Sequence, residues 1–175
     1  MSATGTGETA GAGGLTHLNA AGEARMVDVS AKEVTVRTAT AAGRVRLSAA
    51  CVAALRSGDV PKGDALAVAR IAGIMAAKKT PELVPLCHPL MISGVDVLAE
   101  VTDQGVELRA TVKTNERTGV EMEALTAVSV AGLAVVDMVK AIDRDATITD
   151  VRVVAKSGGR SGDYRRAGEP VRDDA

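Results

Sequence analysis

The sequence predicts an α+β protein in which helices cover one face of an antiparallel sheet. In three stretches apolar residues alternate with polar ones, which is the pattern of a strand with one buried face, and a fourth stretch is expected to be the last strand. Two longer stretches lie between these strands and carry apolar residues at helical spacing. The expected strands are 33–40, 92–102, 106–114 and 147–156, and the expected main helices are 63–79 and 117–143.

The N-terminal part of the expected domain adds a hairpin and a short helix. Val34 and Val36 lie on one face of the first strand, and residues 44–48 are expected to pair with it across a turn at Ala-Ala-Gly. Residues 48–58 are then expected to form a helix that ends at Gly58, because glycine commonly terminates helices.

The helix expected at 63–79 has clear start and stop signals. Asp64 is a suitable N-cap residue, and the two lysines at its end favour the negative end of the helix dipole. Pro81 is expected to end it. One face of this helix is apolar and consists of Leu66, Ala69, Ala72 and Met75.

The second half of the domain is expected to be a hairpin, a buried helix and a last strand. Residues 92–102 and 106–114 flank the turn sequence Asp-Gln-Gly, which favours a hairpin. The helix at 117–143 is apolar on nearly every side, so we expect it to be deeply buried. The resulting βαββαβ order is the ferredoxin-like arrangement, here with an extra N-terminal hairpin or helix.

RNA-binding domains share this layout, but they stack bases on aromatic side chains of the sheet. The one aromatic residue here is Tyr164, near the C-terminus, so we exclude an RNA-binding domain of that kind. With no Phe or Trp, the core must be aliphatic. The 21 basic and 22 acidic residues give a net charge of −1, which does not favour nucleic acid as a partner.

Length and composition favour one cytoplasmic domain. We expect residues 1–14 to be disordered, 15–164 to form a single domain and 165–175 to be a flexible tail. Cys51 and Cys87 are too few for a disulfide framework or a closed zinc site. The N-terminus lacks the features of a signal peptide, and no apolar run reaches the roughly 18 residues of a membrane span.

The string "LVPLCHPLM" at 83–91 places Cys87 and His88 between two prolines. Adjacent residues do not easily bind one metal ion, so we expect no metal site here. A histidine on a stiff loop can carry protons, or it can simply hydrogen bond to backbone, and both interpretations stay open. Cys87 is expected to be a small buried residue rather than a nucleophile.

Several charged residues stand in settings that favour a binding site. Asp137 and Lys140 are one turn apart on the apolar helix, either as a structural ion pair or as an acid–base couple. Lys62 precedes a helix start, and Lys156 begins "KSGGRSGD"; each is either a solvated surface residue or part of an anion site. Together these residues predict a pocket for a small anionic molecule and acid–base chemistry without a metal.

Longer strings resemble one family closely. The chain resembles the cyclic pyranopterin monophosphate synthases, the molybdenum cofactor biosynthesis protein C family, from about Leu15 to Asp163. The matching strings include "LTHLNAAGEARMVDVSAKEVTVRTA", "PLCHPL", "TGVEMEAL" and "AKSGGRSGD". The resemblance implies a ferredoxin-like subunit in a homohexamer, a trimer of dimers, with sites at subunit interfaces. It implies conversion of 3′,8-cyclised dihydroguanosine triphosphate to cyclic pyranopterin monophosphate and diphosphate.

The resemblance also implies roles for particular residues. The catalytic aspartate of the family corresponds to Asp137. No cofactor is implied, although Mg²⁺ can accompany the triphosphate or diphosphate. The other implied catalytic residues are Lys140 and Lys62, and the implied substrate-binding residues are Leu86, Cys87, His88, Met122, Glu123, Glu121, Lys156 and Arg25.

One distance constrains where such a site is built. Fourteen residues separate Glu123 from Asp137, which is roughly 21 Å along a helix at about 1.5 Å per residue. Either the helix breaks, near Gly132, or the two residues belong to different ends of an interface shared by two subunits. Two other classes remain as alternatives: a carrier that binds the pterin precursor without converting it, and a purely structural oligomer.

Overall fold

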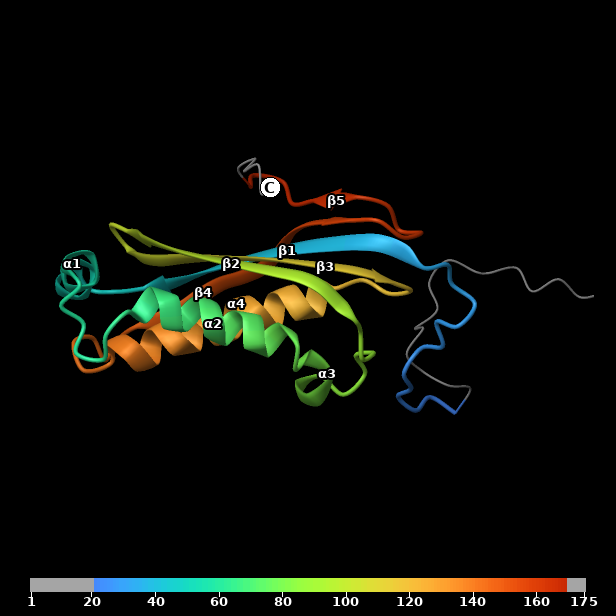
Figure 1. Cartoon of the computed structure of the whole chain (residues 1–175), viewed down its shortest axis with the longest axis horizontal. Coiled ribbons are helices and arrows are strands. Elements are labelled where there is room, and N and C mark those ends of the chain that lie inside the picture. The colour runs from blue at the N-terminus through green and yellow to red at the C-terminus, as the bar shows by residue number, and fades with distance from the viewer. Residues whose placement is uncertain (1–20, 170–175) are drawn as a thin grey trace, which may run out of the picture.

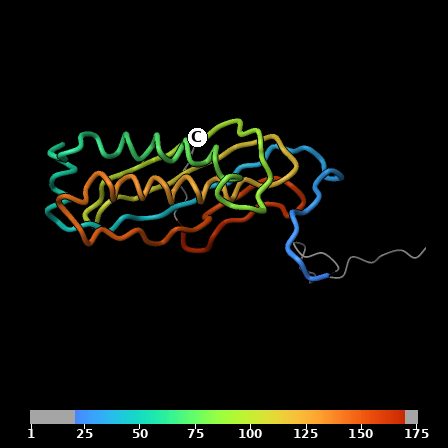
Figure 2. The backbone as a smooth tube through the Cα atoms, turned by 90° about the horizontal axis from the view of Figure 1, so that it is seen from below, coloured from blue at the N-terminus to red at the C-terminus, as the bar shows by residue number. Residues whose placement is uncertain are grey.

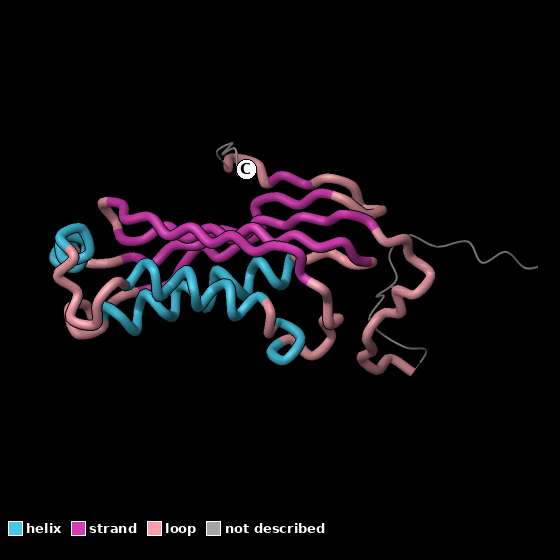
Figure 3. The backbone as a smooth tube through the Cα atoms, in the orientation of Figure 1, coloured by secondary structure: helices cyan, strands magenta, loops and turns pink. Residues whose placement is uncertain are grey.

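The computed structural model describes residues 21–169 and shows one antiparallel sheet with helices on a single face (Figure 1, Figure 3). The strand order is β2-β3-β1-β4-β5, so the first four strands have the expected ferredoxin-like arrangement. The strands are β1 Thr35–Arg46, β2 Ile92–Thr102, β3 Gly105–Glu116, β4 Thr147–Ser157 and β5 Tyr164–Arg165; the helices are α1 Ala49–Ser57, α2 Ala65–Ala77, α3 Thr80–Leu83 and α4 Glu121–Val139.

The expected N-terminal hairpin is wrong, because β1 is a single strand. It pairs with β3 without interruption from Thr35 opposite Glu116 to Arg46 opposite Gly105. The small residues Ala-Ala-Gly lie in the middle of β1 and allow α4 to approach, since a Cβ on Gly43 would lie 2.7 Å from Val128 Cγ1. Small residues here reflect close packing rather than a turn.

Gly43→Ala should therefore destabilise the fold by about 1–3 kcal/mol, because the added methyl group overpacks a close contact. Urea unfolding followed by circular dichroism measures this change. Gly94→Ala is the matched control, since Gly94 lies in β2 and a Cβ there would meet no atom within 4 Å. The control should stay within about 0.5 kcal/mol of wild type. Equal stability of the two variants would contradict the packing argument.

The capping residues expected from sequence are confirmed. The Asp64 carboxylate accepts hydrogen bonds from the backbone N–H groups of Leu66 and Ala67, at 3.1 and 2.9 Å. Gly58 follows α1 in the left-handed conformation, with a φ of 80°. α2 ends at Ala77, and Pro81 lies in the first turn of the short helix α3 rather than directly after α2.

α4 runs along the middle of the sheet, with α2 beside it (Figure 2). It is continuous, so the break considered near Gly132 is absent. Its sheet-facing side is made of small and branched aliphatic residues that are fully buried, namely Ala124, Ala127, Val128, Ala131 and Val135. By length and composition α4 would also suit a membrane, but half of it is buried inside this domain, as in the core helix of a globular protein.

The opposite side of α4 stays exposed, against the expectation of burial on nearly every side. Leu133 is 58% exposed, and α2 beside it exposes Val68, Ile71 and Met75. These residues form an apolar surface on the helical layer of the domain. We call it the helix face.

The C-terminal segment returns to the sheet at β4. Tyr164 and Arg165 pair with β4, and the Arg166 N–H donates to Val154 O at 2.8 Å. Glu169 forms an ion pair with Arg152 at 2.5 Å. Residues 165–169, expected as part of a flexible tail, therefore have specific contacts. The expected disordered segment 1–14 and the last six residues lie outside the described part of the chain.

Candidate active site

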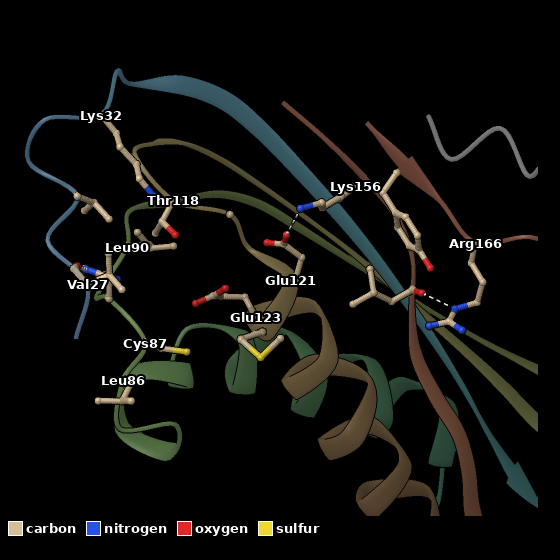
Figure 4. A pocket seen from close by; sticks show the side chains of 16 residues that line it. Val27, Lys32, Leu86, Cys87, Leu90, Thr118, Glu121, Glu123, Lys156 and Arg166 are labelled. Carbon is tan, nitrogen blue, oxygen red and sulfur yellow. Dashed lines mark hydrogen bonds and ion pairs between the residues drawn. The ribbon is translucent and has the colours of Figure 1, made fainter. Parts of the chain in front are cut away.

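A cavity of about 640 Å³ lies where the first turn of α4 meets the 84–91 loop (Figure 4). The segment before β1 forms another wall, and β4 with β5 closes the far side. The expected substrate-binding residues that line this cavity are Leu86, Cys87, His88, Glu121, Met122, Glu123 and Lys156. Seven residues from separate parts of the sequence are thus brought together as expected.

Glu123 is the most constrained polar residue in this cavity. Its side chain is only 2% exposed, and its Oε2 atom has no hydrogen-bond partner. Burial raises the pKa of the carboxyl; a hydrogen bond from its own backbone N–H partly offsets this, and the charge of Glu121 raises it further. An unpaired buried carboxyl is costly, so it favours a ligand that supplies a hydrogen bond.

Glu121 and Lys156 form a second polar feature. Lys156 Nζ lies 3.0 Å from Glu121 Oε1, and it also donates to Ser161 Oγ at 3.1 Å (Figure 4). Both side chains are about three-quarters covered, so the pair is screened less than a fully exposed one. It joins the start of α4 to β4 across the cavity.

His88 has the backbone partner that the simpler interpretation expected. Its Nε2 lies 2.7 Å from the carbonyl oxygen of Val27, which can only accept, so Nε2 carries a hydrogen. In the neutral ring Nδ1 then remains an acceptor. Cys87 is partly buried; burial raises the pKa of its thiol, and the charge of Glu123 raises it further. The thiol form is therefore favoured, as expected of a residue that is not a nucleophile.

A second cluster lies at the other end of α4. Asp137 forms ion pairs with Lys62 at 2.6 Å and with Lys140 at 2.8 Å. Hydrogen bonds from the side chains of Lys140 and Lys62 lower the pKa of Asp137 to about 2. The expected Asp137–Lys140 pair is confirmed, but its expected buried setting is wrong, since 55% of the Asp137 side chain is exposed. In one chain the cluster is a surface ion triplet.

The two clusters do not meet within one chain. Figure 1 shows the start of α4 at one end of the domain and the loop before α2 near the end of α4 at the other. Because α4 is unbroken, the separation of roughly 21 Å between Glu123 and Asp137 stands. Arg25 lies in the segment before β1, is exposed, and is not among the residues that line the main cavity.

Sequence reasoning missed several residues of the cavity wall. Val27 and Lys32 precede the first strand and carry no periodic signal, although the family-like string extends over them. Tyr164 and Arg166 were assigned to the end of the chain, yet β5 brings both to the cavity. Within residues 21–169, no group of three or more His, Cys, Asp or Glu side chains is placed to hold a metal ion.

Comparison with known proteins gives a consistent result. The MoaC family profile matches residues 26–159. A protein of Streptomyces griseus subsp. griseus named cyclic pyranopterin monophosphate synthase is 68% identical over 152 residues, covering 87% of this chain and 86% of the relative. A Nocardioides protein of the same name is 67% identical and covers 87% and 95%. A Roseiflexus protein of that name is 58% identical and covers 86% and 96%. The chain belongs to the MoaC family.

Proposed function

We propose that the protein is a cyclic pyranopterin monophosphate synthase of molybdenum cofactor biosynthesis. It converts cyclised dihydroguanosine triphosphate to cyclic pyranopterin monophosphate and diphosphate. The observation that carries the proposal is the cavity at the start of α4, with the buried, unpaired Glu123 carboxyl beside the Glu121–Lys156 pair. Relatives that carry this name match almost the whole domain.

The cavity suits the ring system of such a substrate. The aminopyrimidinone ring of guanine and of pterins has adjacent N–H donors, and a carboxyl can accept from both. Leu86 and Met122 offer apolar contact to the ring faces, and both line the cavity. Binding would give Glu123 Oε2 the hydrogen bond it lacks, so affinity and specificity arise from the same atom.

In the reaction a ribose hydroxyl oxygen forms a bond to the α-phosphorus. The bond between the α-phosphorus and the oxygen that bridges the α- and β-phosphates breaks. Diphosphate leaves with the electron pair of that bond, and nearby cations stabilise the added charge. The ring rearrangement also needs proton transfers. We assign these transfers to the His88 ring and to the Lys62–Asp137–Lys140 cluster. Within the described part of the chain, Asp137 is the only aspartate that forms ion pairs with two lysines.

We place each active site between two subunits of a homohexamer, a trimer of dimers. Residue 130 lies midway between Glu123 and Asp137 on α4. If two copies of α4 pack antiparallel about that point, the Glu123 end of one chain meets the Asp137 end of the other. The exposed helix face, Leu133 with Val68, Ile71 and Met75, supports such a contact because exposed apolar patches favour association.

Such a contact would also change the chemistry of Asp137. In one chain its pKa is about 2, so it is a weak base. Covering the cluster with a second subunit removes water, which raises the pKa of a carboxyl and lowers that of a lysine. The two values then approach each other, and an Asp137–Lys140 couple can exchange protons near neutral pH.

No resident cofactor is part of this proposal, and Mg²⁺ enters only as a counterion of the triphosphate or diphosphate. We also assign the protein to the cytoplasm. The alternative that the protein is a carrier has weaker support. A carrier needs no proton transfer, so this alternative gives the Lys62–Asp137–Lys140 cluster no function. The relatives of this chain are also named as synthases.

The test is incubation of the purified protein with cyclised dihydroguanosine triphosphate. Released diphosphate and the fluorescent oxidised pterin are followed together, with and without a chelator. Many turnovers per subunit support the synthase. One equivalent of bound, unchanged substrate would indicate a carrier. If the protein neither converts nor binds the substrate, a structural role remains.

A further inference from the structure

Residues 164–169, which we call the C-terminal strap, form one wall of the main cavity. Tyr164 and Arg166 both line the cavity, and the strap runs beside β4 at the edge of the sheet (Figure 1). The Arg166 Nε donates to the carbonyl oxygen of Val153 at 2.9 Å, which holds the guanidinium at the cavity wall (Figure 4). The strap thus adds the one aromatic side chain of the sequence and a cation to this site.

The backbone of the strap is weakly attached to the domain. Every residue from Ser161 to Gly168 is exposed, so this stretch buries little apolar surface. β5 is two residues long and pairs with β4, and the next backbone N–H, that of Arg166, donates to Val154 O at 2.8 Å. A strand this short is not stable alone. The position of the strap therefore depends on a further contact.

Glu169 provides that contact at the end of the strap. Its side chain is 12% exposed, in contrast with the exposed residues before it, and its Oε1 lies 2.5 Å from Arg152 Nε. Gly168, with a φ of 81°, turns the chain so that Glu169 meets the sheet. The Arg152 side chain is about three-quarters covered, so water screens this ion pair less than an exposed one.

The sheet forms a site that is suited to this carboxylate. Arg152 Nη1 donates to the carbonyl oxygen of Asp150 at 2.6 Å, which orients the guanidinium and directs its Nε to Glu169. Arg152, Arg109 and Glu169 line one recess of about 70 Å³. The hydrogen bond from Arg152 lowers the pKa of Glu169; burial partly offsets this, and the charges of Arg152, Arg109 and Arg166 lower it further. The carboxylate is therefore ionised at neutral pH.

We propose that the Arg152–Glu169 ion pair is a latch that positions the C-terminal strap and thereby places Tyr164 and Arg166 against the substrate. This proposal rests on the proposed function and adds two residues that are not among those lining the main cavity. Both are positioning residues, since they act through the strap. Opening of the latch lets the weakly attached strap move aside for substrate entry, and reclosing returns it over the bound substrate.

The kinetics of diphosphate release test the latch. Glu169→Gln and Arg152→Ala should each raise KM about tenfold, the effect of losing one charge-assisted contact. Both should leave kcat within about twofold, because the residues assigned to proton transfer are unchanged. The double variant should be no worse than either single variant, since both changes remove the same contact. Increases in KM that multiply in the double variant would overturn the latch.

Substitutions within the strap test which side chains it presents. Arg166→Ala should raise KM about tenfold, because Arg166 lines the main cavity. Arg165→Ala is the matched control, since Arg165 is the preceding residue of the same strap and is not among the residues that line that cavity. It should keep the KM of wild type. Equal effects of the two variants would contradict the proposed placement of Arg166.

Limited digestion with trypsin, followed by mass spectrometry, tests the strap without requiring turnover. Trypsin cleaves after Arg165 and Arg166, and the strap must leave β4 to enter the protease. Glu169→Gln should speed this cleavage about tenfold, because proteolysis follows the population of the open form. Saturating GTP should slow cleavage more in wild type than in this variant.

Asp103→Ala is the control for digestion, because it breaks an aspartate–arginine ion pair at the β2–β3 turn, away from the strap. It should leave cleavage in the strap unchanged. Equal cleavage rates in wild type, Glu169→Gln and Arg152→Ala would overturn the latch. Faster cleavage in both latch variants, combined with no turnover by wild type, would support the latch and reject the synthase.

Discussion

Asp137→Ala should lower turnover by about 100-fold to 10,000-fold, the range expected for loss of a positioned proton carrier. Asp137 holds two lysines at 2.6 and 2.8 Å, so its loss removes a carboxylate and releases both cations. The residue is exposed in the single chain, and its removal leaves the core intact. The rate of diphosphate release at saturating substrate measures the effect.

The control for this prediction is Asp103→Ala. Asp103 is also an exposed aspartate in an ion pair, with Arg56 at 2.6 Å, but it lies at the β2–β3 turn. It should keep near wild-type turnover, and circular dichroism should be unchanged for both variants. If Asp137→Ala works at the wild-type rate, Asp137 is not catalytic.

Glu123→Gln should weaken substrate binding and turnover while stabilising the free protein. The amide cannot accept from both N–H groups of an aminopyrimidinone ring, so the complex loses a hydrogen bond to a buried charge. The free variant, in contrast, no longer buries an unpaired carboxyl, so it should be more stable than the wild type. Residues that bind ligands often lower the stability of the free protein. We expect the substrate KM to rise about tenfold or more.

The stability effect has a defined pH dependence. Because the pKa of Glu123 is raised in the folded state, the folded protein binds its proton more tightly than the unfolded chain. This contribution is fully present below the unfolded value of about 4.3 and is lost as pH rises through the folded pKa. The stability gain of Glu123→Gln should therefore be larger at pH 7 than at pH 4.

Urea unfolding of wild type and Glu123→Gln at several pH values measures this difference. Glu121→Gln is the comparison, because Glu121 stands in the same turn of α4 but is paired with Lys156. It should not gain stability at neutral pH. A stability difference between wild type and Glu123→Gln that does not change with pH would show that Glu123 is ionised alike in both states.

Local signals predicted much of this fold because they depend on neighbouring residues. The Asp64 cap, the glycine after α1 and the β2–β3 hairpin with its two-residue loop are set by short-range hydrogen bonds and backbone preferences. The last strand was expected at 147–156 and is found at Thr147–Ser157. These elements have the same geometry whichever surface they pack on.

Elements that depend on distant contacts were not predictable in this way. Gly43 resembles a turn residue in the sequence, but its size is set by Val128 from α4. β5 is two residues long and exists because β4 offers a free edge. The segment around Val27 has no periodicity, and its position depends on the His88 hydrogen bond. Only the folded chain shows these contacts.

The candidate site shows the same division. The Asp137–Lys140 pair followed from helical spacing, whereas the approach of Lys62 to Asp137 required the fold. The clustering of His88 with Glu123 came from the family resemblance, not from spacing. Which residues of two subunits face each other depends on an interface that one chain does not contain.

The most direct test of a shared active site is complementation between two inactive variants. His88→Ala and Asp137→Ala are mixed under conditions that exchange subunits, and turnover is then measured. A mixed dimer would contain one doubly damaged site and one intact site, so about a quarter of full activity should return under random pairing. A mixture of Asp137→Ala and Lys140→Ala is the matched control and should stay inactive, because both changes fall on the same half of the site. If mass spectrometry confirms exchange and the first mixture also stays inactive, the active site is not shared between subunits.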